Sequence, residues 1–90
     1  MSKAVVDPAE LRRFAQDLKR FSTALAGQMV VLQGRMMTLG QTWRDQEQQK
    51  FAEKFENTLK VLHRFNDDVA EHVPFLIKKA EKIEEYLNQR

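Results

Sequence analysis

Leucines recur at every seventh residue through the first half of the chain. The series runs Leu11, Leu18, Leu25, Leu32 and Leu39, with Phe14 and Phe21 at the intermediate apolar positions and Met29 and Met36 continuing that row one residue later. A sustained seven-residue repeat is typical of helices that pack along one stripe at a shallow angle. The pattern predicts a helix over about residues 8–39.

The residues at both ends of this segment agree with a helix. Asp7 is a good N-cap, Pro8 suits the first helical position, and Glu10 stands where a capping box has its carboxylate. Gly40 follows the last leucine and is a candidate C-cap. The predicted helix therefore has a defined start and a defined end.

The second half of the chain repeats the same period. Phe55, Leu62, Val69, Leu76 and Ile83 are seven residues apart, with Phe65 beside them. We expect a helix over about residues 45–88, with a kink or break near Pro74, because proline removes a backbone donor and crowds the preceding turn. The short turn at about residues 40–44 forces the two helices to lie antiparallel. The chain is thus predicted to be a single all-α domain over residues 1–90, a two-helix hairpin.

Both halves carry more apolar surface than one seam can bury. Residues 29–32 read "MVVL", which covers most of the circumference of a helical turn. A helix that is apolar on two sides is buried on two sides, and a lone hairpin offers only one burial surface. We therefore expect dimerisation into a four-helix bundle, with a second copy or a related hairpin chain as partner. The predicted core and dimer seam comprises Leu11, Phe14, Leu18, Phe21, Leu25, Met29, Leu32, Met36, Phe55, Leu62, Phe65, Val69, Leu76 and Ile83.

Composition and charge exclude several classes of protein. The chain has no cysteine, so it forms neither disulfides nor thiolate metal sites. Fifteen basic residues are interleaved with thirteen acidic ones, which favours a mixed-charge surface over a nucleic-acid interface. Arg12, Arg13, Lys19 and Arg20 keep a weak binder of nucleic acid or anionic surfaces as an alternative. No apolar run is long enough for a signal peptide or a membrane span.

The sequence does not predict catalysis, a cofactor or a metal centre. His63, Asp67 and Glu71 share one helical face, but ion pairs on a helix surface explain this spacing as well as a metal site does. Neither histidine belongs to a Glu-x-x-His pair of the kind that builds di-iron centres in helical bundles. We therefore expect no enzyme, no small-molecule substrate and no metal.

The only tryptophan lies in the polar stretch between the two predicted helices. Thr42 is a candidate N-cap for the second helix, which would place Trp43 in the first turn and Asp45 three residues after the cap. Phe51, two turns later, would lie on a similar face. In physical terms Trp43 is a candidate hydrophobic plug across the closed end of the bundle.

The length, the hairpin layout, Trp43 in the turn and an aromatic residue eight positions later resemble the WXG family of hundred-residue, ESAT-like substrates of type VII secretion. The resemblance covers the whole chain in layout, although the family's Trp-x-Gly is here Trp43–Arg44–Asp45. It implies a protein that acts through protein–protein contacts, with a secretion ATPase among its partners. Trp43, Asp45 and Phe51 would then form the turn and recognition site.

The resemblance also implies a cytoplasmic protein that is later secreted without a signal peptide. Family members that carry an export signal show Tyr-x-x-x-Asp/Glu after the second helix, whereas Tyr86 is followed four residues later by Arg90. This leaves three hypotheses open: a passenger exported with a partner, a variant signal, or a relative outside the secretion system. A structural or adaptor coiled-coil subunit of the cytoplasm is the alternative function.

Overall fold

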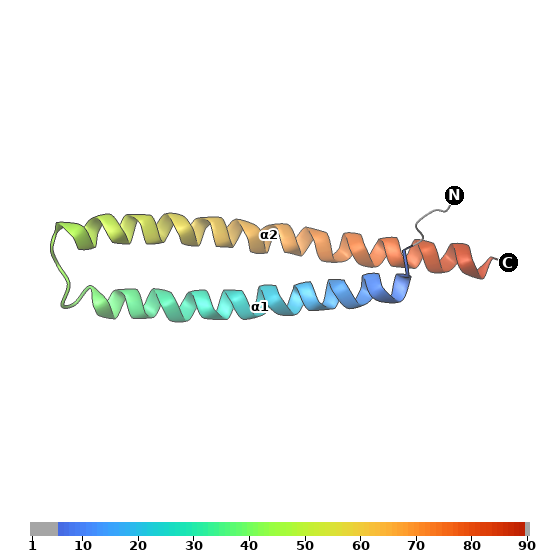
Figure 1. The fold of residues 1–90 in the computed structure, drawn as a ribbon, viewed down its shortest axis with the longest axis horizontal. Coiled ribbons are helices and arrows are strands. Elements are labelled where there is room, and N and C mark those ends of the chain that lie inside the picture. Colours follow the sequence, from blue (N-terminus) through green and yellow to red (C-terminus); the bar gives the residue numbers. More distant parts are fainter. Residues whose placement is uncertain (1–5, 90) are drawn as a thin grey trace.

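The chain folds into two long helices that lie side by side in opposite directions (Figure 1). In the computed structural model, which describes residues 6–89, α1 spans Pro8–Leu39 and α2 spans Gln46–Asn88. No strand occurs within these residues. The all-α antiparallel hairpin predicted from the heptads is confirmed.

The ends of α1 are set by local chemistry. The Asp7 carboxylate accepts a hydrogen bond from the Ala9 N–H at 2.9 Å, which satisfies one of the free donors at a helix start. At the other end the Gly40 N–H donates to the Met36 carbonyl at 3.0 Å. Gly40 has φ −66° and ψ −14°, so this C-cap uses a right-handed conformation open to any residue.

The seam between the helices follows alternating steps of three and four residues. Within residues 6–89, its buried side chains are Ala15, Met29, Leu59, Val69 and Ala80. In α1 the seam leucines alternate with Ala15 and Ser22. Each of these two residues directly follows a phenylalanine, Phe14 or Phe21, that is exposed. A seam with one stripe from each helix is a narrow core, and most side chains remain accessible from at least one side.

Helix α2 is longer than α1 and continues without a break across Pro74. It has 43 residues against 32 in α1, so the difference amounts to about 16 Å of helix at 1.5 Å per residue. The last turns of α2 extend beyond the first residues of α1 (Figure 1). Tyr86 and Leu87, on this extension, are exposed.

The molecule is a thin rod with an unusually large surface for its mass. It measures 69 × 24 × 16 Å, and its radius of gyration of 20.2 Å compares with about 12 Å for a compact domain of this length. Its accessible surface is 7548 Å², whereas a compact monomer of 10.6 kDa exposes about 5,500 Å². Neither described helix has the length and apolarity needed to cross a membrane.

Candidate interaction site at the turn and the aromatic face

The turn begins as an extension of the C-terminal end of α1. The Gln41 N–H donates to the Thr38 carbonyl at 3.1 Å, and the Trp43 N–H donates to the Leu39 carbonyl at 2.9 Å. The Thr42 hydroxyl also donates to the Leu39 carbonyl, at 3.4 Å. Because this hydroxyl serves the end of α1, the prediction that Thr42 caps α2 is wrong.

Asp45 is the N-cap of α2. Its Oδ1 accepts a hydrogen bond from the Gln48 N–H at 3.0 Å, and its backbone is extended, with φ −89° and ψ −175°. Trp43 therefore precedes the helix and does not lie in its first turn. No described residue has a positive φ, so the turn does not require the glycine that Asp45 replaces in the family motif.

Three aromatic rings from the turn and the start of α2 pack in a row. The centroids of Trp43 and Phe51 are 5.9 Å apart with the rings inclined by 36°. Phe51 stacks on Phe55 at 6.1 Å and 19°. Such offset contacts add to the apolar burial of the rings. Phe51 holds the half-buried Trp43 against the turn, and Phe55 anchors the row in the seam.

One broad face of the hairpin carries most of the exposed aromatic rings. Phe21 of α1 and Phe65 of α2 meet edge to face, with centroids 5.9 Å apart and rings at 88°, which shows that both helices contribute to the same face. Other large apolar residues join it at whole numbers of helical turns. We call this the aromatic face; its members are Phe14, Phe21, Leu32, Leu39, Phe51 and Phe65, each between 37% and 57% exposed.

The residues predicted to form the core and dimer seam thus fall into two groups. Ten are buried or half-buried between α1 and α2: Leu11, Leu18, Leu25, Met29, Met36, Phe55, Leu62, Val69, Leu76 and Ile83. The other four, Phe14, Phe21, Leu32 and Phe65, are exposed on the aromatic face. The hairpin therefore packs the first group between its own two helices and leaves the second group exposed to solvent.

Two polar contacts that the sequence did not predict join the helices. The Ser22 hydroxyl donates to Oδ1 of Asn66 at 2.7 Å inside the seam. Near the open end, Arg12 forms a two-pronged pair with Glu84, with Nη2 2.7 Å from Oε1 and Nε 3.2 Å from Oε2. The hydrogen bond from Arg12 lowers the pKa of the Glu84 carboxyl below its ordinary value. The sequence would have indicated Ser22 only if the seam had been placed one residue after Phe14 and Phe21.

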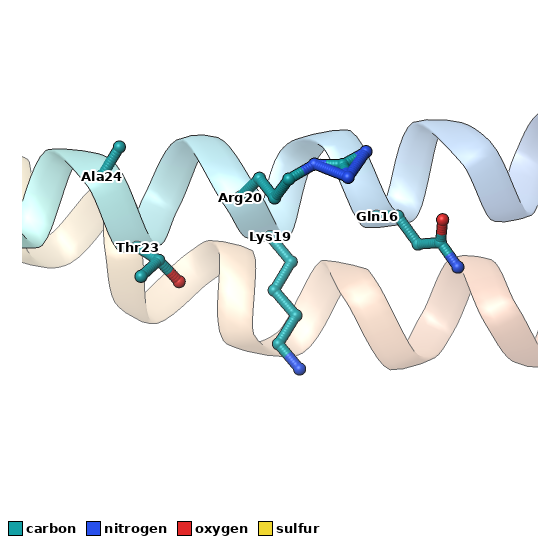
Figure 2. Close-up of a pocket in the computed structure, with 5 residues that line it drawn as sticks. All are labelled: Gln16, Lys19, Arg20, Thr23 and Ala24. Atoms are coloured by element: carbon teal, nitrogen blue, oxygen red, sulfur yellow. The ribbon is translucent and has the colours of Figure 1, made fainter.

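Two of the four basic residues in the first half of α1 take part in ion pairs. Arg12 is paired with Glu84, and Arg20 is paired with Asp17 at 2.7 Å. Figure 2 shows the shallow depression beside them, which is lined by Gln16, Lys19, Arg20, Thr23 and Ala24, all from α1. Within residues 6–89, no three acidic or histidine side chains come together as a metal site would require.

The fold and these two features define the class: a helical hairpin that presents an aromatic turn and an unpartnered apolar face. A sequence model for the family described as "WXG100: Proteins of 100 residues with WXG" matches residues 4–88. The chain belongs to this family, whose members are helical hairpins associated with type VII secretion.

Comparison of structures gives the same fold. The crystal structure of a mutant of the secreted protein EsxB from Bacillus anthracis str. Sterne superimposes with a TM-score of 0.74. The match covers 100% of this chain and 99% of the other, with 22% sequence identity. At this identity the likeness concerns the fold. Among curated proteins, none matches the chain in sequence.

Proposed function

We propose that this chain is a substrate or an escort of a type VII secretion machine and that it works as a dimer of helical hairpins. Family membership supports the link to this pathway, and the structural relative is itself described as secreted. The proposal makes the chain an interaction protein without enzymatic activity. Its partners are a second hairpin chain and the secretion ATPase.

The aromatic face is the surface proposed to bind the second hairpin. The accessible surface of the chain exceeds that of a compact monomer by about 2,000 Å², which is more than the roughly 800 Å² that each partner buries in a standard protein interface. Exposed aromatic rings are the side chains that dominate the energetics of such interfaces. The second hairpin is either another copy of this chain or a related one, and both would complete a four-helix bundle.

Trp43 is proposed to form the recognition surface for export, together with Asp45 and Phe51. The observation that carries this role is that the indole is only half-buried and stands on a turn capped independently by Asp45. An indole needed only as a plug would be covered by the hairpin, whereas this one keeps an accessible side. A partly exposed tryptophan on a rigid support is a typical anchor for a protein partner.

Replacement of Trp43 by alanine tests this role. Secretion of Trp43→Ala should fall to near background in a strain with the secretion machine, while helicity measured by circular dichroism stays close to that of the wild type. Helicity should persist because no backbone hydrogen bond of the turn depends on the indole.

The matched control is Phe75→Ala, which removes an exposed aromatic ring far from the turn. Secretion of the control should equal that of the wild type. Normal export of Trp43→Ala would contradict the recognition role. Absence of the wild-type protein from the medium, with the machine active, would favour the adaptor subunit of the cytoplasm.

A further inference from the structure

A groove opens at the closed end of the hairpin on the side away from the aromatic face. Its floor is formed by Met36 and Met37 of α1 and by Phe55 and Leu59 of α2. Glu56, at its edge, comes nine residues before Phe65, which corresponds to two and a half helical turns. The two side chains therefore leave α2 on opposite sides, and a hairpin bound to the aromatic face leaves the groove open.

The floor of the groove is apolar and adaptable. Met37 is 76% exposed, the highest value among the large apolar side chains of residues 6–89, and Met36 is half-buried beside it. Methionine is flexible and polarizable, and it recurs on surfaces that accept helices. A groove between two packed helices with a volume of about 510 Å³ has the shape to receive the apolar stripe of a third helix.

The edge of the groove is acidic. Glu53 and Glu56 line it from α2, and no basic side chain does so. Neither glutamate takes part in an ion pair within residues 6–89, where the salt bridges found are Arg12–Glu84 and Arg20–Asp17. The chain as a whole carries a net charge of +2, so this acidic edge opposes the overall charge. Local charge of this kind selects partners of the opposite sign.

We propose that this groove binds an amphipathic helix of a partner protein whose apolar side chains are flanked by lysine or arginine. The apolar stripe would lie on Met37 and its neighbours, and the basic residues would face Glu53 and Glu56. The site does not rest on the proposed function, because it lies apart from the aromatic face and from Trp43 and shares with the aromatic row of the turn only Phe55, which stacks on Phe51. A dimer of hairpins would present two such grooves.

The methionines allow a direct test by nuclear magnetic resonance. The methyl groups of Met1, Met29, Met36 and Met37 can be labelled with ¹³C in the intact protein. Two helical peptides of about 18 residues serve as probes, a length at which such helices form in water. Both carry leucines along one stripe; one has lysines beside the stripe and the other has glutamates at the same positions.

The lysine peptide should shift the Met36 and Met37 signals in a saturable manner and leave Met29, which is 2% exposed in the seam, in place. The glutamate peptide should bind at least about tenfold more weakly, as expected when charges of the groove edge repel it. Equal affinity for the two peptides, or no shift at Met36 and Met37, would overturn the proposal.

Paired variants separate the groove from general electrostatics. Glu53→Gln combined with Glu56→Gln should remove most of the preference for the lysine peptide. The matched control, Asp67→Asn with Asp68→Asn, removes the same charge from exposed positions further along α2 and should retain the preference. Loss of the preference in the control as well, or its survival in the groove variant, would show that the groove edge does not select the partner.

Discussion

Asp45 occupies the position at which the family motif has glycine, and its carboxylate caps α2. The Asp45 carboxylate accepts a hydrogen bond from the Gln48 N–H, whereas the N–H groups of the turn before it donate to carbonyls at the end of α1. Trp43 lies between the end of α1 and the cap of α2, and its ring packs on Phe51. The sequence indicated these residues, but it could not assign the cap, because Thr42 and Asp45 both have suitable side chains and only the path of the turn decides between them.

Removal of the cap should destabilise the hairpin in a way that depends on the replacement. Asp45→Ala is expected to lower the free energy of unfolding by about 1 kcal/mol, because it leaves N–H groups at the helix start without a partner. Asp45→Gly, which restores Trp-x-Gly, should cost only a few tenths of that amount, since water and backbone flexibility compensate. Urea unfolding at one protein concentration measures both. An alanine variant as stable as the glycine variant would contradict the capping role.

The Arg12–Glu84 pair should make stability depend on pH in the acid range. Hydrogen bonding to Arg12 lowers the pKa of Glu84 from its ordinary value of 4.5. A carboxyl whose pKa is lower in the folded state contributes stability above its unfolded pKa and loses it as the pH falls through the folded pKa. The difference in Tm between wild type and Glu84→Gln should therefore be full near neutral pH and should shrink below about pH 4.5.

The control for this pair is Glu85→Gln, which changes an exposed neighbour outside any ion pair of the described residues. Its Tm should follow that of the wild type throughout. A Glu84→Gln difference that stays constant from neutral to strongly acidic pH would show that the pair does not titrate as described.

At the scale of the elements, the heptads predicted both helices and their antiparallel pairing, because a seven-residue apolar period admits few other structures. They did not separate the seam from the aromatic face. Phe14 and Phe21 are larger and more hydrophobic than Ala15 and Ser22, so a prediction from hydrophobicity alone assigns the phenylalanines to the seam. The geometry places the small residues inside, because two helices that touch along their length need small side chains at some seam positions.

Pro74 should weaken α2, and its replacement should strengthen it. Proline inside a helix costs about 3 kcal/mol relative to alanine, because it lacks an N–H and crowds the preceding turn. Pro74→Ala is expected to raise the free energy of unfolding by about 1 to 3 kcal/mol, as α2 already continues through this position. Thermal and urea unfolding at matched concentration measure the change. A less stable variant would show that the hairpin depends on the proline.

At the scale of the whole molecule, the rod exposes an apolar face beside its seam, and we propose that a second hairpin covers this face. Within residues 6–89 the seam buries five side chains, and the aromatic face adds a second set of phenylalanines that are open to solvent. The sequence predicted this excess from segments that are apolar on two sides. The sequence could not show that the exposed apolar residues of both helices lie on the same face, because this follows from the contact between Phe21 of α1 and Phe65 of α2.

The most direct test of the account is the solution mass of the purified chain, measured by light scattering over a series of concentrations. The wild type should have twice its chain mass of 10.6 kDa, or should be a poorly folded monomer that becomes helical with a related hairpin chain. Phe21→Ser with Phe65→Ser should shift the self-paired form toward monomer, whereas Val30→Ser with Met37→Ser, which are exposed on the opposite side of α1 from Phe21, should not. A wild-type chain that remains a helical monomer with a cooperative melting transition at every concentration would contradict the account.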